Sequence, residues 1–282
     1  MERIIQADDR YKDETTYIKQ VLPKITTKNE NRESLRQSCK DIITRWKSKQ
    51  MKKVLDLDWA LCLAAENGNE CDLHVWLRCG ADVHGYNDEA LFHAASNGHK
   101  AIVQILLNRG ANVRAGSDRA LRYAAKHGHA DIVELLLEHH ADVHACYDSA
   151  LRTASANGHE ATVQALLRHH ASVSAIDTQA LHLAAKHGHV AVVQLLLDHN
   201  ADVHATNDYA LQLAASFQHL AVVQLLLDRG ADARAIELDK LQDETSPNAK
   251  AIVDLLATHG ASLAKDTPSC VGWLKATLPN IY

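Results

Sequence analysis

The segment Asp118–Tyr147, DRALRYAAKHGHADIVELLLEHHADVHACY, returns along the chain at intervals of 30 residues. A leucine marks the same place in every copy: Leu61, Leu91, Leu121, Leu151, Leu181, Leu211 and Leu241. An alanine near the end of each copy keeps the same phase, from Ala81 to Ala261. The seven copies follow one another without insertion or deletion. A strict repeat of this length predicts a solenoid, in which each unit packs on its neighbours.

Each copy has the pattern of two short helices. The first half places apolar residues on one helical face: Ala120, Leu121, Ala124 and Ala125. Gly128 follows, and glycine ends helices because it accepts the left-handed backbone conformation. A second apolar stripe with helical spacing comes next: Ile132, Val133, Leu136 and Leu137. We therefore predict an all-α fold, an alpha-solenoid of about seven stacked helix-turn-helix repeats.

The repeats set the expected domain boundaries. The repeat domain covers 58–265, in the units 58–87, 88–117, 118–147, 148–177, 178–207, 208–237 and 238–265. Residues 1–57 form a charged N-terminal segment that ends in a helix over 33–57. Its apolar stripe is expected to cover the open end of the first repeat, because solenoid ends need a cap. Residues 266–282 form a tail that either folds back on the last repeat or docks on a partner.

Turn residues also recur in phase. An aspartate precedes the first helix in most copies, where it is expected to cap the helix N-terminus: Asp88, Asp118, Asp148 and Asp208. Gly110 and Gly230 close two copies at a turn that needs a left-handed backbone. His140, His170 and Asn200 take the same place in the middle copies. Histidine and asparagine tolerate this conformation at some cost, so we expect slightly strained turns there.

The run from Ala90 to Val113 reads A-L-x-x-A-A-x-N-G-H-x-x-I-V-x-x-L-L-x-x-G-A-x-V and resembles the ankyrin repeat. The resemblance extends over about residues 58–265. Two features depart from the family pattern: D-x-A-L replaces the T-P-L-H opening, and each unit is shorter than the usual ~33 residues. The missing residues imply a reduced hairpin finger. The resemblance also implies a non-enzymatic scaffold that binds a partner protein through the concave face of the stack.

Histidine is abundant, with nineteen residues, and much of it is in phase. One set follows the turn between the two helices: His99, His129, His159, His189 and His219. Another occupies the turn between repeats: His84, His144 and His204. The resemblance implies that the first set ties the inter-helix turn. Cys71, His74, Cys79 and His84 match no standard zinc spacing, so we expect no metal and no cofactor.

Composition and motifs exclude several classes of function. The formal net charge of −5 gives no basic excess for nucleic-acid binding. The chain lacks the G-x-S-x-G, P-loop, H-E-x-x-H and G-x-G-x-x-G motifs, so we predict neither catalytic residues nor enzyme activity.

The sequence also sets an expected location. No run of 18 apolar residues is present, so no membrane span is predicted. The N-terminal MERIIQADDR lacks the apolar core of a signal peptide. The six cysteines have no repeating spacing, which is typical of a reduced protein. We expect a cytoplasmic protein, with the nucleus as the alternative because of the basic cluster over 45–53.

Positions of the first helices that do not pack inward should line up as columns across the repeats. The candidate partner-binding residues lie in these columns or beside them: Tyr86, Glu89, Phe92, Arg119, Arg122, Tyr123, Lys126, Arg152, His182, Lys186, Tyr209 and Phe217. The middle repeats are basic on this side, whereas the second helices carry Glu134, Glu138, Asp198 and Asp228. We therefore expect a monomer that binds a protein partner with an acidic segment. The alternative is an adaptor that links a bound protein to a ubiquitin ligase or host complex through its terminal segments.

Overall fold

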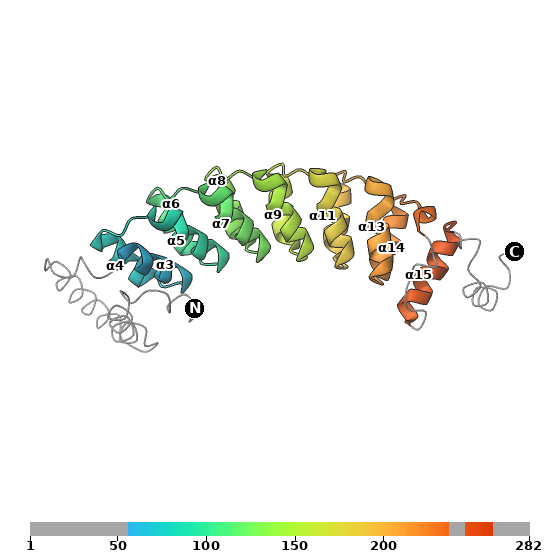
Figure 1. Ribbon diagram of the computed structural model, residues 1–282, viewed down its shortest axis with the longest axis horizontal. Helices are drawn as coiled ribbons and strands as arrows, with labels where there is room; N and C mark the ends of the chain where they lie inside the picture. The colour runs from blue at the N-terminus through green and yellow to red at the C-terminus, as the bar shows by residue number, and fades with distance from the viewer. Residues whose placement is uncertain (1–55, 237–245, 262–282) are drawn as a thin grey trace, which may run out of the picture. The chain divides into compact units, whose positions relative to one another are not determined.

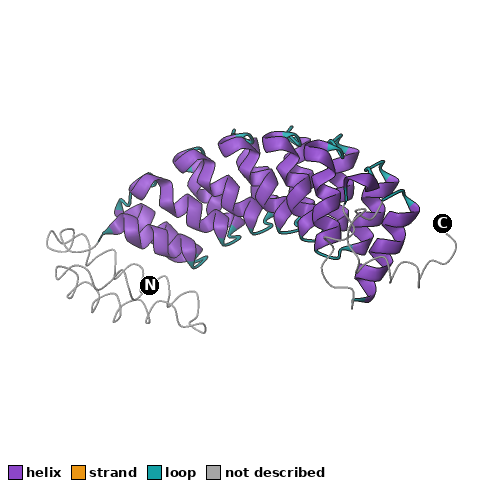
Figure 2. Cartoon of the chain, turned by 45° about the vertical axis from the view of Figure 1, so that its right-hand side comes forward, coloured by secondary structure: helices purple, strands orange, loops and turns teal. Residues whose placement is uncertain are grey.

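The computed structural model describes residues 56–236 and 246–261 (Figure 1). Thirteen α-helices and one short 3-10 helix lie in this part of the chain. These two ranges contain no strand (Figure 2). The prediction of an all-α fold is therefore confirmed for them. The N-terminal segment with most of its helix over 33–57, residues 238–245 and 262–265 of the last repeat, and the tail over 266–282 lie outside the described residues.

The helices form six consecutive pairs and one further helix. The pairs are α3 (Leu57–Glu66) and α4 (Glu70–Cys79), α5 (Gly85–Ser96) and α6 (Lys100–Asn108), α7 (Ala115–Lys126) and α8 (Ala130–Glu138), α9 (Ala145–Ala156) and α10 (Glu160–Arg168), α11 (Ala175–Lys186) and α12 (Val190–Asp198), and α13 (Ala205–Ser216) and α14 (Leu220–Asp228). The 3-10 helix η4 (Ala233–Ala235) and α15 (Pro247–Thr258) come after them.

The described residues divide into two compact units. The first unit covers 56–94 and 101–112, and the second covers 95–100, 113–236 and 246–261. In the first unit, α3 packs on α4. In the second unit, the first helices α7, α9, α11 and α13 pack side by side, and the second helices α8, α10, α12 and α14 form a parallel row (Figure 1). This is the stacked arrangement that the repeat predicts.

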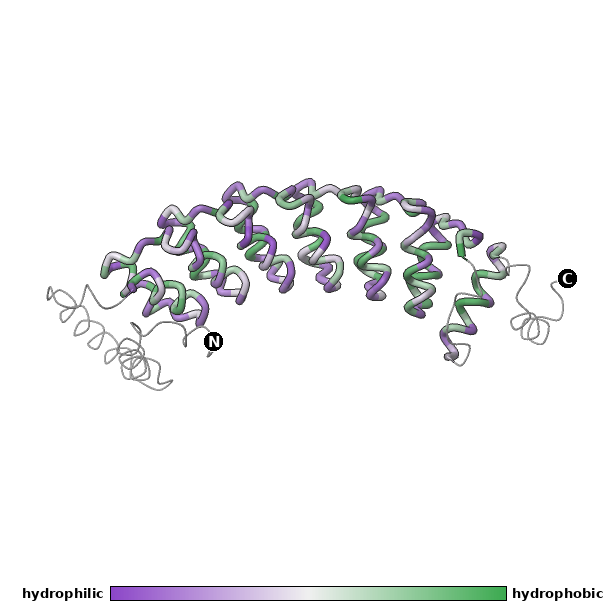
Figure 3. Tube along the Cα trace, in the orientation of Figure 1, coloured by the Kyte–Doolittle hydropathy of each residue, from purple (hydrophilic) through white to green (hydrophobic). Residues whose placement is uncertain are grey.

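The core of the second unit lies between these rows. The repeated leucines Leu121, Leu151, Leu181 and Leu211 are each 0% exposed. The repeated alanines beside them are also buried, and their small side chains let neighbouring helices pack closely. Hydrophobic residues run along the helices, whereas many of the connecting turns are hydrophilic (Figure 3). Each buried leucine contributes about 1.5–3 kcal/mol through the hydrophobic effect.

A turn of three left-handed residues lies at the start of each first helix of the second unit, where the sequence predicts a reduced hairpin finger. In α7, Gly116, Ser117 and Asp118 have φ of 59°, 57° and 56°. Equivalent turns open α9, α11 and α13. At the other turn, the left-handed conformation predicted for His140, His170 and Asn200 is confirmed, with φ of 68°, 66° and 65°. A left-handed L-residue costs about 1–2 kcal/mol, so side-chain contacts must hold these turns in place.

The repeated aspartates supply one such contact. The Oδ1 atoms of Asp118, Asp148 and Asp208 accept the backbone N–H found 24 residues later, at 2.8, 2.7 and 2.9 Å. Asp88 does the same in the first unit. The prediction that these residues cap their own helices is therefore wrong, because each accepts an N–H from 24 residues later and not one from the start of its own helix. A capping residue has extended φ, whereas these aspartates have φ near +55°.

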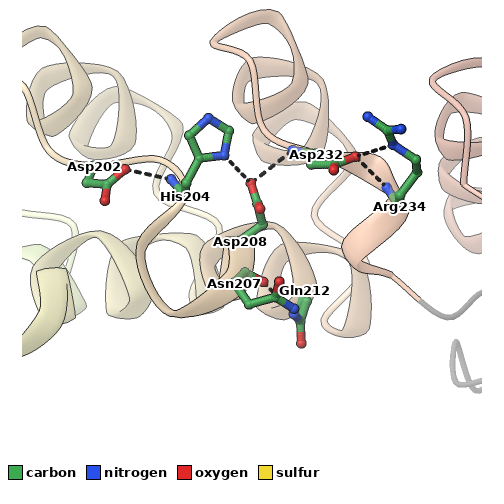
Figure 4. A network of polar contacts seen from close by, with 7 residues as sticks. All are labelled: Asp202, His204, Asn207, Asp208, Gln212, Asp232 and Arg234. Carbon is green, nitrogen blue, oxygen red and sulfur yellow. Dashed lines mark hydrogen bonds and ion pairs between the residues drawn. The ribbon is translucent and has the colours of Figure 1, made fainter.

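Histidines join Asp148 and Asp208 to the preceding repeat, whereas Asp118 has Arg114 at the equivalent position. His144 Nδ1 lies 3.0 Å from Asp148 Oδ1, and His204 Nδ1 lies 3.1 Å from Asp208 Oδ1. Figure 4 shows Asp208 between His204 and the backbone of Asp232. The Asp148 and Asp208 carboxylates therefore each accept from two neighbouring segments and fix the turn between them.

The other set of histidines ties the inter-helix turns. His129, His159, His189 and His219 each donate through Nε2 to a backbone carbonyl of the preceding repeat, at 2.9–3.2 Å. Their rings pack on the glycine of the preceding turn. A Cβ at Gly128 would lie 2.6 Å from His159 Nδ1, so glycine is required there. The structural role that the resemblance implied is confirmed for these four residues.

The repeat over 148–177 carries two buried hydroxyls where its neighbours have apolar side chains. Ser155 and Thr162 are 0% exposed, and neither hydroxyl has a hydrogen-bond partner. We expect the double substitution Ser155→Ala and Thr162→Val to stabilise the protein by about 1–2 kcal/mol, because an unpaired buried hydroxyl costs free energy. A urea unfolding curve checks this, and a lower midpoint in the variant would contradict it.

Candidate partner-binding face

The exposed side of the first helices in the second unit is basic. Its cationic residues, called here the basic face, are Arg119, Arg122 and Lys126 on α7, Arg152 on α9, and Lys186 on α11. The helical segments 119–126, 149–156, 179–186 and 209–216 contain no Asp or Glu. The second helices have the opposite character, with Asp131, Glu134, Glu138, Glu160, Asp198 and Asp228. The second unit is therefore electrostatically two-sided.

Arg122 and Arg152 also hold the left-handed turns of their own repeats. Arg122 donates through Nε to the Ser117 carbonyl at 2.9 Å and through Nη2 to the Gly116 carbonyl at 3.1 Å. Arg152 donates in the same way to the carbonyls of Tyr147 and Cys146, at 3.1 and 3.0 Å. Carbonyls are neutral, so both positive charges remain on the face. Much of the donor capacity of each guanidinium is used within the fold.

Two lysines of the basic face lie over aromatic rings. Lys126 Nζ is 5.4 Å from the ring centroid of Tyr123, and Arg119 Cζ is 5.9 Å from the same ring. Lys186 Nζ is 5.4 Å from the ring centroid of Phe217, which is 50% exposed. Such cation–π contacts are each worth about 0.5–1 kcal/mol at exposed sites. They limit the directions in which the ammonium groups can point.

His182 lies below the surface, although the sequence places it in one column with Arg122 and Arg152. Its side chain is 8% exposed, and its ring meets Tyr209 edge-on at 5.2 Å. Burial lowers the pKa of the His182 imidazole, so the ring favours its neutral form. His182 therefore supports the exposed ring of Tyr209 and adds no charge to the face.

The remaining candidates, Tyr86, Glu89 and Phe92, belong to the first unit. The Tyr86 hydroxyl donates to the Asp56 carboxylate, and its ring meets Trp59 edge-on at 6.3 Å. Glu89 pairs with His93 Nε2 at 3.4 Å. Phe92 lies against the His93 ring at 4.9 Å. Each of the three is thus engaged within its own unit.

Two histidines outside the predicted set lie beside the lysines. His127 is exposed and donates through Nδ1 to the Ser96 carbonyl at 2.7 Å. His187 is exposed as well. Partial loss of water around its ring, and then the positive charge of Lys186, lower the pKa of its imidazole. The repeated K-H-G-H motif is the sequence signal that identifies both residues.

The described part of the chain has neither a metal-binding cluster nor a helix that could span a membrane. No group of three or more His, Cys, Asp or Glu side chains is arranged there to hold a metal ion. Burial raises the pKa of the Cys79 thiol, which opposes the thiolate form that zinc requires. Within the same residues, every helix is too short or too polar to cross a membrane.

Comparison with known proteins agrees with the repeat geometry. A family model described as ankyrin repeats (3 copies) matches residues 61–146 and 151–237. Among curated proteins, none matches the sequence. The crystal structure of the human ASB11 ankyrin repeat domain is similar, with a TM-score of 0.61 and 26% identity over 68% of this chain and 96% of that one. The chain therefore belongs to the ankyrin repeat family, a class of protein-interaction scaffold.

Proposed function

We propose that this chain is a non-enzymatic scaffold that binds a protein partner through an acidic segment, and that the basic face receives this segment. The supporting observation is the charge asymmetry of the second unit: five cationic residues lie on the first helices, and the segments 119–126, 149–156 and 179–186 that carry them contain no Asp or Glu. The carboxylates at the starts of these helices are the buried Asp118 and Asp148 and the exposed Asp177. Such a surface attracts an anionic segment and disfavours a cationic one.

Aromatic side chains favour a protein as the partner. Tyr209 is 42% exposed and Phe217 is 50% exposed, and both lie in the same helical row as the cations. Protein interfaces are enriched in Tyr, Phe and Arg, which combine apolar area with polar contacts. An exposed ion pair adds about 0.2–1 kcal/mol, so charge selects the partner and steers its approach. The rings supply the apolar contacts that prolong binding.

Charge reversal of Lys126 and Lys186 is expected to weaken binding of a glutamate-rich peptide by about tenfold or more, because two attractions become repulsions. The measurement is the fluorescence anisotropy of a labelled peptide titrated with the full chain. Lys126 and Lys186 are preferable to Arg122 and Arg152, because the arginines also hold their own turns.

The matched control reverses Arg168 and Arg229, which changes the net charge equally. Arg168 pairs with Glu134, and Arg229 pairs with Asp198 near the second helices. The control is expected to keep most of the affinity. An equal loss in both variants, or failure of the unmodified chain to prefer acidic over neutral peptides, would reject the proposed function.

A further inference from the structure

The two lysines of the basic face are two repeats apart. The motif K-H-G-H occurs at 126–129, at the end of α7, and again at 186–189, at the end of α11. Between them, α9 ends in the uncharged Ala156, and α13, which follows the second motif, ends in the uncharged Ser216. The cations at this end of the helices are therefore separated by one helix that lacks a charge there.

The two motifs share an anchored histidine and a lysine that lies over an aromatic ring. In each, the lysine Nζ lies 5.4 Å from an aromatic ring centroid, giving the two lysine–aromatic pairs Lys126–Tyr123, within α7, and Lys186–Phe217, between neighbouring repeats. In each, the second histidine is tied to a carbonyl of the preceding repeat, His129 to Ser96 at 3.2 Å and His189 to Ala156 at 3.0 Å. The lysines are thus the last residues of α7 and α11, directly before anchored turns.

The spacing of these pairs selects the shape of the ligand. Helix α9 packs against both α7 and α11. Packed helices lie about 8–10 Å apart, so two steps span about 16–20 Å. An extended chain advances about 3.3 Å per residue, so this span corresponds to about five or six residues. Side chains alternate between the two sides of an extended chain, and an even separation keeps both on one side.

We propose that the acidic segment binds as an extended peptide across α7, α9 and α11, with two acidic residues at positions i and i+6. This inference rests on the proposed function. One carboxylate meets Lys126 and the other meets Lys186. The helix between them supports the intervening residues: Asn157, just after α9, is exposed and uncharged, and Ala156 is half-buried. A helical peptide would place the same two residues only about 9 Å apart, which is too short to reach both lysines.

The test uses labelled peptides of constant composition in which two glutamates are separated by 4, 5, 6, 8 or 10 positions, titrated with the full chain at low salt. Affinity is expected to be highest at i+6 and to fall about two- to fivefold at i+4 and at i+10, where one ion pair is lost. The i+5 peptide directs its second glutamate to the opposite side and is expected to bind less well than i+6.

Lys126→Gln and Lys186→Gln are each expected to remove the preference for i+6, while Arg168→Gln, on the second-helix side, leaves it intact. Equal affinity at all spacings would overturn the inference and leave the proposed function standing, since acidic peptides would still bind. Retention of the i+6 preference in either lysine variant would also overturn it. Absence of binding by every acidic peptide would reject the proposed function itself.

Discussion

Replacement of Asp148 by glycine is expected to destabilise the second unit by about 2–3 kcal/mol. The Asp148 carboxylate is nearly buried and accepts the Ser172 N–H at 2.7 Å and His144 Nδ1 at 3.0 Å. Hydrogen bonds to a charged group contribute about 1.5–3 kcal/mol, and a partner left without its acceptor adds a desolvation cost. Glycine removes the acceptor while keeping the left-handed backbone accessible.

Three further variants separate the hydrogen bonds from backbone strain. Asp148→Ala should cost about 1 kcal/mol more than Asp148→Gly, because alanine has a Cβ in a residue with φ of 53°. Asp148→Asn keeps an oxygen acceptor and tolerates this φ, so its effect should be the smallest. Thr178 stands at the equivalent place in the repeat 178–207, where its hydroxyl donates to the Asp177 carbonyl. Thr178→Asp would supply the missing acceptor for that repeat and should be stabilising.

Amide hydrogen exchange localises the effect. Since each repeat contacts its neighbours alone, loss of the Asp148 bonds should raise exchange first in the repeats on either side of the turn, and less in α13 and α14. Urea unfolding followed by circular dichroism gives the magnitude. Wild-type stability in Asp148→Gly would show that water replaces the carboxylate without cost, and the account of the turn would be wrong.

The helices and their buried faces could be predicted from periodicity, because an alanine and leucine pattern at 3.6-residue spacing has few other ways to bury itself. The left-handed turns at His140 and His170 could also be predicted from the glycines in phase with them. The role of Asp118 could not. Aspartate suits a helix N-cap and a left-handed turn equally well, and its donor is 24 residues away in sequence.

For the candidate partner-binding face as well, the sequence could predict positions but not side-chain contacts. Arg122, Arg152 and His182 share one column, so their spacing assigns them one environment. The structure separates them because the arginines are long enough to reach the carbonyls of their own turns, whereas the His182 ring lies beneath Tyr209. Which side chains remain available to a partner is thus determined by length and by the neighbour in the next repeat. Single-repeat patterns do not contain that information.

Asp72 is expected to make the first unit more stable at pH 5 than at pH 7.5. This residue is 8% exposed, at the place in α4 where the second helices of other repeats bury Ile102, Ile132 or Val192. Burial raises the pKa of the Asp72 carboxyl from 3.8 to about 6. Asn69 Nδ2 donates to Asp72 Oδ2 at 2.7 Å, but a neutral amide does not offset the loss of water around a charge.

The sign follows from proton binding. Because the pKa is higher in the folded state, the carboxyl favours folding fully below about pH 4, and this contribution is lost as the pH rises through about 6. A difference of about two pKa units corresponds to about 3 kcal/mol as an upper bound. The start of α4 attracts a negative charge by about 0.3–1 kcal/mol, which is smaller than the desolvation cost. The charged form is therefore destabilising at pH 7.5.

Asp72→Asn keeps the shape of the side chain and removes its titration. The variant should be about 1–3 kcal/mol more stable than the parent at pH 7.5, and the difference should vanish near pH 4. Fluorescence of Trp59 and Trp76, both in the first repeat, reports unfolding of this unit when Trp46 and Trp273 are replaced by phenylalanine. Glu70→Gln, an exposed neighbour on α4, is the control and should keep the pH profile of the parent. Parallel pH profiles for the parent and Asp72→Asn would mean that this carboxyl stays hydrated in solution, because a hydrated carboxyl titrates alike in both states and cannot make folding depend on pH.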